Sequence, residues 1–367
     1  KLNSIEFDIE IFEPIYKESK SIKRMFEKSY EKAIQKTNRT TYQAMEAFVH
    51  NLNTMHSRAG AQVPFSSINL GTDTSAEGRM VIKNFLLSTD AGLGKGETPI
   101  FPVSIFKVKE GVNYNPEDKN YDLFKLACKV SAKRLFPNFS FLDAPFNLAF
   151  YQEGNYKTEV GYMGCRTRLM SDVTDLNNQT TGGRGNLSFT SINLPRIAIR
   201  NGICLKEREK ADMDNFYKEL ADMMDLVRDQ LLERFEVQCS KHSYNFPFLL
   251  EQGVWADGDK LKPNDRLRKL LKHGSLTIGF IGLAESLKAL IGKHHAESEE
   301  AQKLGLEIIG FMRKRCDEYS KQYNLNFTLI ATPAEGLSGR FVGIDKAIFG
   351  KIKGVTDRDY YTNSFHV

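Results

Sequence analysis

A single cysteine stands in the stretch GYMGCRTR at residues 161–168, between glycine and arginine. A structural cysteine prefers apolar neighbours, and a metal-binding one usually has a second ligand about two to four residues away. Cys165 has neither in this stretch. Two kinds of chemistry stay open from the residues alone: a thiolate nucleophile favoured by Arg166 and Arg168, and a buried thiyl radical that abstracts a hydrogen atom.

The segment ATPAEGLSGRF, residues 331–341, is a candidate anion site. The apolar run before it predicts a strand, and Pro333 is typical of the first turn of a helix. Gly336 and Gly339 would let backbone N–H groups approach an anion, and Arg340 adds positive charge. This pattern is typical of phosphate binding, and a plain strand-to-helix turn is an equal alternative.

Two further stretches contain polar residues that suit a cavity. HSRAGAQVPFSSINLGTDTS, residues 56–75, is rich in small polar residues and has no acid before Asp73, which predicts a polar lining. TGGRGNLSFTSINLP, residues 181–195, predicts a glycine-rich turn that enters a buried strand. Asn186 would lie near the start of that strand, where its carboxamide either orients a ligand without adding charge or caps the turn.

Two glycine-containing stretches favour ordinary structure over a ligand site. A nucleotide-binding loop needs a helix after its glycines, but AGLGKGETPIF at 91–101 leads into a segment with two prolines that reads as a strand. This stretch therefore predicts a turn. GSLTIGFIGLAES at 274–286 predicts a tightly packed strand or helix start.

The elements that must position these residues follow from apolar spacing. Helices are expected over 18–36, from a new N-cap in NRTT (38–41), over 208–237 and over 296–322. PEDKNYDLFKLACKVSAKRLF predicts a helix with Cys128 packed in its apolar face, and GRMVIKNFLLS predicts another helix. Strands are expected in PIFPVSIFKV, NFTLIAT and FTSINLPRIAI, the last interrupted by Pro195. This alternation predicts an α/β fold in one domain over residues 1–367.

Composition restricts the class of protein. The chain has 367 residues, a net charge of +5 and 41% hydrophobic residues, and it lacks an apolar run long enough for a membrane span. Five separated cysteines without a CxxC pair predict a reducing, cytoplasmic setting and no metal site of thiolates. The N-terminus does not resemble a signal peptide. Basic and acidic residues are mixed, so we expect no membrane partner and no direct nucleic-acid partner.

Four of these stretches together resemble one family. HSRAGAQVPFSSINLGTDTS, GYMGCRTR, RGNLSFTSINLPRIAI and ATPAEGLSGRF are similar, in order and spacing, to the anaerobic (class III) ribonucleoside-triphosphate reductases, which are glycyl radical enzymes. The resemblance implies a ten-stranded α/β barrel of two five-stranded parallel halves with a central finger loop, of which this chain covers part. It also implies that Cys165 is the thiyl radical that takes the 3′ hydrogen of the ribonucleotide.

The resemblance assigns further roles. Asn186 is expected to hold formate or a substrate hydroxyl, and Ser66 and Ser67 to line the substrate cavity. The loop expected to bind substrate phosphate, with the amides from Gly336 to Gly339 as donors, comprises Pro333, Glu335, Gly336, Leu337, Ser338, Gly339 and Arg340. Residues 18–40, rich in Lys and Arg, are expected to contribute to an effector site near a subunit interface.

The implied reaction is anaerobic reduction of ribonucleoside triphosphates to 2′-deoxyribonucleoside triphosphates for DNA replication, with formate as the expected reductant and a thiol protein as the alternative. The resemblance implies ATP and deoxynucleotide effectors acting allosterically, a homodimer, and a radical-SAM iron–sulfur activating enzyme. The glycyl radical and a four-cysteine zinc site are expected beyond Val367, and a regulatory cone and a second active-site cysteine before Lys1.

Because those parts lie outside the 367 residues, we expect the chain alone to have no turnover. Three alternatives stay open. A glycyl radical lyase would share the barrel, but its pyruvate-cleaving type has two adjacent cysteines where this chain has one. A nucleotide-binding scaffold without catalysis and an ordinary cysteine hydrolase are the others.

Overall fold

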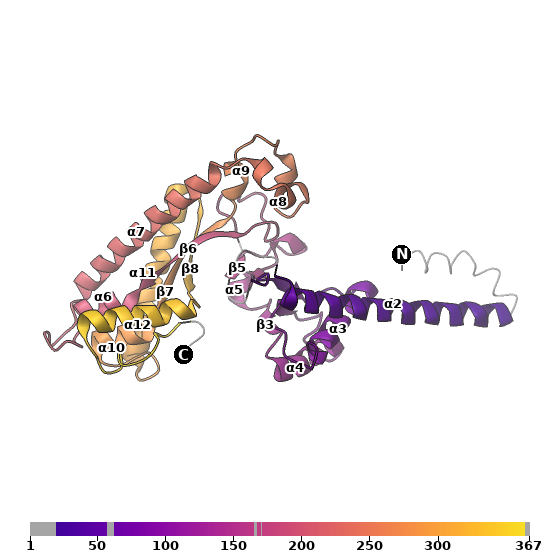
Figure 1. Ribbon diagram of the computed structural model, residues 1–367, viewed down its shortest axis with the longest axis horizontal. Coiled ribbons are helices and arrows are strands. Elements are labelled where there is room, and N and C mark those ends of the chain that lie inside the picture. The colour runs from indigo at the N-terminus through magenta and orange to yellow at the C-terminus, as the bar shows by residue number, and fades with distance from the viewer. Residues whose placement is uncertain (1–19, 57–61, 165–166, 170, 364–367) are drawn as a thin grey trace. The chain divides into compact units, whose positions relative to one another are not determined.

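The structure is a computed structural model that describes residues 20–56, 62–164, 167–169 and 171–363. The chain divides into two compact units, residues 1–170 and residues 171–367 (Figure 1). Each unit has a three-stranded parallel sheet covered by helices. Within the described residues, no helix is both long and apolar enough to cross a membrane.

The first unit is built around the sheet β1-β2-β3, in which all three strands run parallel. The central strand β2 is almost entirely buried, and Phe106 packs with Leu86 and Val130 in the core of this unit. In chain order the elements are α2 (Lys20–Thr54), β1 (Ser67–Leu70), α3 (Ala76–Ala91), β2 (Val103–Val108), α4 (Tyr121–Arg134), β3 (Asn138–Phe141), α5 (Pro145–Leu148), η1 (Tyr156–Thr158), β4 (Gly161–Met163) and β5 (Thr167–Leu169).

The second unit is built around the parallel sheet β6-β7-β8, and each strand is followed by a helix. Figure 1 shows the long helices α7 and α11 beside this sheet. The elements are β6 (Asn186–Asn193), α6 (Leu194–Asn201), α7 (Met213–Cys239), η2 (Ser243–Asn245), α8 (Pro247–Glu251), η3 (Gly258–Lys260), α9 (Arg268–Leu271), β7 (Ser275–Ile281), α10 (Leu283–Ile291), α11 (Glu299–Tyr323), β8 (Asn326–Ala331) and α12 (Glu335–Phe349).

The two faces of this second sheet differ in chemistry. On β7, Leu276 and Ile278 are buried in the main core with side chains of α7 and α11. Successive side chains of a strand point to opposite faces, so Thr277 and Gly279 lie on the other face. Thr277, Thr328 and Ser191 meet polar partners on that face, and so does the candidate residue Asn186. The other candidate residues of this unit lie in the turn from β8 into α12.

A β-bulge brings Asn186 onto the polar face. The register of β6 against β7 shifts between Asn186 and Ser188. A bulge inserts one extra residue, which changes the face that the following side chains point to. Asn186 and Ser191, an odd number of residues apart, can therefore both meet side chains on the same face of the sheet.

The expected break between two N-terminal helices was wrong. One continuous helix, α2, runs through NRTT at 38–41. Short polar side chains can satisfy backbone groups locally or reach a neighbour instead of ending a helix. Here the Thr41 hydroxyl donates to the Thr37 carbonyl oxygen at 2.9 Å, and Asn38 Oδ1 accepts from Asn84 on α3 at 2.8 Å.

Two other local expectations were wrong. Pro195 does not interrupt a strand: β6 ends at Asn193 and Pro195 lies in the first turn of α6, where a proline costs no hydrogen bond. Cys128 lies in α4 as expected but is exposed, because the buried side of this helix is formed by Leu123, Ala127 and Val130.

The α/β fold with parallel strands is confirmed. The described residues form two three-stranded parallel sheets and one antiparallel hairpin. The ten-stranded barrel and the single domain over 1–367 describe how the two units associate, and they stay predictions.

Gly279 offers a test of packing on the polar face of the second sheet. A Cβ there would lie 2.0 Å from Thr332 Oγ1 and 2.7 Å from Ser191 Oγ, two atoms that are hydrogen-bonded at 2.8 Å. Gly279→Ala should therefore lower the free energy of unfolding by about 1–3 kcal/mol, measured by urea denaturation.

Gly310 in α11 is the matched control, because a Cβ there meets no atom within 4 Å. Gly310→Ala should raise the free energy of unfolding by about 0.5–1 kcal/mol. Equal effects of the two substitutions would contradict the packing described for Gly279.

Candidate active site

The stretch GYMGCRTR forms a tight antiparallel hairpin in the first unit. Strand β4 pairs with β5, with Tyr162 opposite Arg168 and Met163 opposite Thr167. Residues 164–166 connect the two strands, and Gly164 has a φ of +63°, a backbone conformation that favours glycine. Cys165 and Arg166 lie outside the described residues, so the predicted radical cysteine is located only through the hairpin on either side of it.

Strand β1 holds this hairpin through side chains. The Asn69 carboxamide donates to the Tyr162 carbonyl oxygen at 2.8 Å and accepts from the Tyr162 N–H at 3.0 Å. The Gly164 N–H donates to Ser67 Oγ at 2.9 Å. Ser67, predicted to line a substrate cavity, thus has its hydroxyl on the residue before Cys165. Ser66 is half-buried and makes a local 3.5 Å hydrogen bond to the Pro64 carbonyl.

The opposite strand of the hairpin rests on α5. Arg168 Nη1 donates to Asn147 Oδ1 at 2.9 Å, and the Arg168 guanidinium stacks over the Phe146 ring at 4.9 Å. Asn147 is itself buried and donates to the Phe141 carbonyl oxygen at 2.7 Å. Arg168 is therefore held by a hydrogen bond and a ring contact, and both are made to other residues of the first unit.

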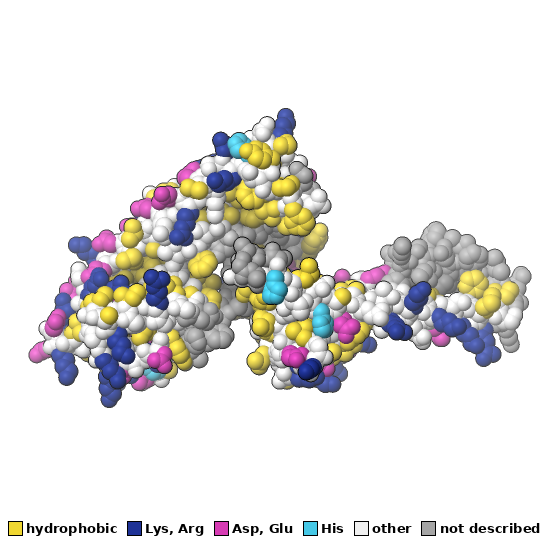
Figure 2. All heavy atoms as spheres, viewed as in Figure 1, with side chains coloured by type: hydrophobic (Ala, Val, Ile, Leu, Met, Phe, Trp, Pro, Cys, Tyr) yellow, Lys and Arg dark blue, Asp and Glu magenta, His cyan; other side chains and the backbone are white. Residues whose placement is uncertain are grey.

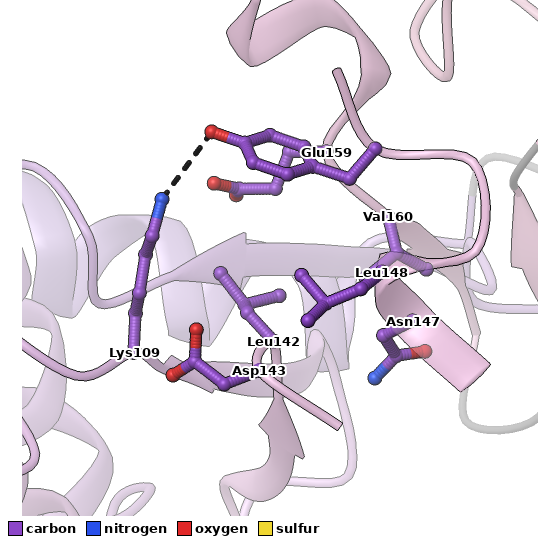
Figure 3. A pocket seen from close by; sticks show the side chains of 8 residues that line it. Lys109, Leu142, Asp143, Asn147, Leu148, Glu159 and Val160 are labelled. Atoms are coloured by element: carbon purple, nitrogen blue, oxygen red, sulfur yellow. Dashed lines mark hydrogen bonds between the residues drawn. The ribbon is translucent and has the colours of Figure 1, made fainter. Parts of the chain in front are cut away.

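A small pocket lies next to this hairpin (Figure 3). Lys109 Nζ donates to the Tyr151 hydroxyl at 3.4 Å across it. Its cavity volume is about 40 Å³, whereas ligand pockets commonly measure about 300–1,000 Å³. The pocket therefore suits ordered water rather than a nucleotide. Its lining residues are Lys109, Leu142, Asp143, Asn147, Leu148, Tyr151, Glu159 and Val160.

Asn186 begins a chain of hydrogen bonds across the second sheet. The Thr277 hydroxyl donates to Asn186 Oδ1 at 3.1 Å, and it lies 2.8 Å from the Thr328 hydroxyl on β8. Because Thr277 uses its proton on Asn186, Thr328 is the donor of the second bond. This polarity fixes the Asn186 carboxamide with its oxygen toward Thr277, which leaves Nδ2 as the end that can donate to a ligand.

The predicted phosphate loop follows β8 as expected, but the expected place of Pro333 in the first turn of the helix was wrong. Helix α12 begins at Glu335 with Ala334 as its N-cap, so Pro333 lies before the helix. The N–H groups of Leu337 and Ser338 both donate to the Ala334 carbonyl oxygen at 3.0 Å, so these two are used by the helix itself. Gly336 is exposed, and a Cβ there would meet open space. As the second residue of the helix, Gly336 has an amide without an intrahelical partner. Arg340 is also exposed.

Residues 359–363 contact the turn from β8 into α12. The Asn363 carboxamide donates to the Pro333 carbonyl oxygen, and the Tyr361 N–H donates to the Ser338 carbonyl oxygen at 3.5 Å. A Cβ on Gly339 would lie 3.2 Å from the Asp359 carbonyl oxygen. Ser338 is fully buried, so it belongs to the support of the loop rather than to its open side. The Glu335 side chain and residues 57–61 lie outside the described part.

A buried carboxylate that was not predicted from the sequence lies in the segment after the hairpin. Asp172 Oδ1 accepts from Asn326 Nδ2 at 3.0 Å and from the Thr174 hydroxyl at 2.8 Å, and Asp172 Oδ2 lies 2.7 Å from His273 Nδ1. Burial by itself raises the pKa of Asp172, but hydrogen bonds from His273, Asn326 and Thr174 outweigh it and hold this pKa well below its usual range. The network ties the segment to the starts of β7 and β8.

Asn69 and Thr277 were missed as well. Asn69 stands two residues after Ser67 in SSIN, which is the spacing of one face of a strand, so the sequence contained a signal for it. The sequence contained no such signal for Thr277 or Asp172, because their partners lie 91 and 101 residues away.

Among the described residues, no group of three or more His, Cys, Asp or Glu side chains is placed to hold a metal ion.

The comparison with known families decides the assignment. The chain matches the family described as anaerobic ribonucleoside-triphosphate reductase over residues 10–367. The chain belongs to this family. It is 34% identical over 336 residues to the anaerobic ribonucleoside-triphosphate reductase of Salmonella typhimurium, covering 90% of this chain and 45% of that protein. It is 35% identical over 335 residues to that of Enterobacteria phage T4, covering 90% and 52%.

Solved reductases of this kind share the fold. One anaerobic ribonucleotide reductase gives a TM-score of 0.63 at 16% identity, covering 91% of this chain and 50% of that one. The Thermotoga maritima enzyme in complex with dATP and CTP gives 0.58 at 15% identity, covering 89% and 51%. This chain spans about half the length of the relatives it matches.

The Asp172 network makes stability depend on pH. A carboxylate whose pKa is lowered by folding stabilises the protein above its unfolded pKa of about 3.9, and this stabilisation is lost as pH falls below about 5. Asp172→Asn should lower the free energy of unfolding at pH 7 by about 2 kcal/mol and make its further fall toward pH 3 shallower than in the wild type.

Asp175→Asn is the control for the change in net charge. Asp175 lies in the same segment, where its Oδ1 accepts from the Asn178 N–H at 3.2 Å, outside the Asp172 network. Urea denaturation of all three proteins at a series of pH values makes the comparison. Parallel pH profiles for wild type and Asp172→Asn would show that Asp172 does not stabilise the fold in this way.

Proposed function

We propose that this chain is the part of an anaerobic ribonucleoside-triphosphate reductase that supplies the radical cysteine and one side of the substrate cavity. The full-length protein reduces ribonucleoside triphosphates to 2′-deoxyribonucleoside triphosphates without oxygen. The observation that supports this most directly is the tight hairpin whose connection contains Cys165, in a chain that matches the family over residues 10–367.

Cys165 is the hydrogen-abstracting group in this proposal. A glycyl radical, proposed to lie in a part of the full-length protein that this chain does not span, supplies the unpaired electron. The Cys165 sulfur then takes the 3′ hydrogen atom of the ribose, so an S–H bond forms as the C3′–H bond breaks. The 2′ hydroxyl takes up a proton and leaves as water, and formate supplies two electrons as it is oxidised to CO2. The Cys165 S–H then returns a hydrogen atom to C3′, which restores the radical on sulfur.

Asn186 is the proposed ligand for formate or for a substrate hydroxyl. Its oxygen is committed to Thr277, and its Nδ2 can donate to an anion. A neutral carboxamide suits this role because it orients formate without adding a second charge to the cavity. The hydrogen bonds of Thr277 and Thr328 set the direction in which Asn186 Nδ2 points.

The turn from β8 into α12 is the proposed site for substrate phosphate. The start of a helix of 15 residues attracts anions through its dipole and its unpaired N–H groups. Gly336 supplies an amide on the open side, and Arg340 one helical turn later supplies positive charge. Leu337 and Ser338 shape the turn, since their amides already bond to Ala334.

Effectors and partners complete the proposal. Anaerobic reductases have been solved with dATP in the specificity site and with dATP and CTP together. We propose ATP and deoxynucleotide effectors here too, with a contribution from the basic residues of α2, which Figure 2 shows in dark blue. A homodimer, a radical-SAM iron–sulfur activating enzyme, a zinc site outside this chain and a cytoplasmic location belong to the same proposal.

Cys165→Ser tests the radical assignment. In the full-length protein, activated without oxygen, this variant should lose turnover to below about one thousandth of wild type, because a serine O–H bond is too strong to replace the S–H bond. Binding of nucleotide should stay within about twofold. The measurements are deoxynucleotide formation and equilibrium nucleotide binding.

Cys128→Ser is the matched control, because Cys128 is an exposed free cysteine in α4. It should keep wild-type turnover. Reduction of substrate by Cys165→Ser would refute the proposed reaction.

Thr277→Val tests the role of the hydrogen-bond chain. The substitution keeps the side-chain shape and removes the donor that orients Asn186. We expect the KM for formate to rise about fivefold to tenfold, equivalent to the loss of about 1 kcal/mol of hydrogen bonding. The KM for the nucleotide should change less than twofold.

Thr190→Val is the control on the neighbouring strand. The Thr190 hydroxyl donates to Gln230 on α7 at 2.8 Å, on the helix-covered side of β6. It should leave the KM for formate unchanged. A rise of the same size in both variants, or in neither, would remove the assignment of formate to Asn186.

A further inference from the structure

We infer that Asn69 and Ser67 are positioning residues for the radical hairpin, and that β1 sets the position of Cys165 through them. The inference rests on the proposed function, because it assigns a purpose to the position of Cys165. Its basis is a set of three hydrogen bonds among described residues. Two come from Asn69 and one from Ser67, and all three end on main-chain groups of β4 and of the residue after it.

The residues that form these hydrogen bonds have the same sequence spacing on β1 and on the hairpin. Ser67 and Asn69 are two residues apart on β1, so their side chains point to the same face of the strand. Their partners Tyr162 and Gly164 are also two residues apart. The hairpin is therefore held at two positions, one within β4 and one directly after it, which fixes its register as well as its distance from β1.

Asn69 acts in place of a neighbouring strand. Two residues in a hydrogen-bonded antiparallel pair exchange both N–H···O bonds. The Asn69 carboxamide makes the same exchange with Tyr162, donating from Nδ2 and accepting at Oδ1. Aspartate cannot donate, and alanine can do neither, so asparagine is the side chain that completes this pair with the geometry observed.

Side chains, rather than a main-chain ladder, connect the described hairpin to the first sheet. The pair β4-β5 is a sheet of its own. The other two strands of the first unit add contacts of the same kind. The Ser140 hydroxyl on β3 lies 3.0 Å from the Tyr162 hydroxyl, and Lys107 on β2 pairs with Glu159 at 2.8 Å. Strand β1 thus contributes two anchors and β2 and β3 one each, all to β4 or to residues just before or after it.

The position of a hydrogen-abstracting atom matters strongly for the rate. A displacement of about 1 Å away from the reacting atom can cost about 100-fold. Gly164 directly precedes Cys165, and its N–H is the group that Ser67 holds. Loss of the anchors on β1 should therefore slow hydrogen abstraction while leaving the nucleotide site intact.

The test uses the full-length protein, activated without oxygen, with the substitutions Asn69→Ala, Asn69→Asp and Ser67→Ala. We expect kcat to fall about 10-fold to 100-fold for both Asn69 variants and less for Ser67→Ala, which loses one bond instead of two. For the two Asn69 variants, the KM for the nucleotide and the glycyl radical content, measured by electron paramagnetic resonance, should stay within about twofold. The isotope effect with 3′-deuterated substrate should increase, because hydrogen abstraction becomes slower relative to the other steps.

Asn53→Ala is the matched control. The Asn53 carboxamide also bridges main-chain groups, donating to the Val49 and Phe101 carbonyl oxygens and accepting from the N–H groups of Ile100 and Phe101. It joins α2 to the segment before β2 and does not contact the hairpin. A kcat for Asn69→Ala equal to that of wild type, or a loss equal to that of Asn53→Ala, overturns the inference.

The outcomes separate this inference from the proposed function. If Cys165→Ser is inactive and Asn69→Ala is fully active, the reaction stands and the positioning role fails. If wild type forms no deoxynucleotide, or Cys165→Ser does, the proposed function itself fails. Should Asn69→Ala not fold, Ser67→Ala decides: an unchanged kcat and isotope effect overturn the inference, and a lower kcat with a larger isotope effect supports it.

Discussion

The exchange of two hydrogen bonds between Asn69 and the main chain of Tyr162 is the contact on which the candidate site of the first unit depends. A hairpin of two three-residue strands cannot be stable on its own in water. It needs a surface to rest on, and the parallel sheet offers Ser67, Asn69 and Ser140 for this purpose. The sheet's own fold therefore determines where the paired strands of the hairpin lie.

In the second unit too, the fold of the sheet determines where the site residues lie. The bulge in β6 turns Asn186 toward Thr277, and the absence of a side chain at Gly279 makes room for the Ser191 and Thr332 hydroxyls. Both are main-chain features that determine where polar side chains meet. The result is a stripe of hydroxyl and carboxamide groups along one face of a sheet whose other face is a large apolar core.

Local signals in the sequence were sufficient for the elements and for some of the site. Alternation and apolar spacing predicted β2, β8, α3, α7 and α11, and the strand-to-helix turn at Pro333 was found from residue types alone. Contacts between distant segments were not predictable in this way. Nothing near Asp172 in the chain indicates His273 or Asn326, and NRTT has the residues of a helix start although tertiary contacts of Asn38 keep α2 continuous.

Charge is distributed in the second unit in a way that suits radical chemistry. Where Asn186, Thr277 and Thr328 meet, and where Ser191 meets Thr332, the groups are neutral hydroxyls and a carboxamide, which can orient a substrate without competing for its protons. The buried carboxylate of Asp172 instead has four polar contacts: two from Thr174 in its own segment, and one each from His273 and Asn326 near the starts of β7 and β8. Since a hydrogen atom carries no net charge, its transfer gains little from a charged residue nearby and depends mainly on distance and orientation. The proposed hydrogen transfer therefore favours neutral positioning groups, and the contacts of Asn69 in the first unit and of Thr277 in the second are of this kind.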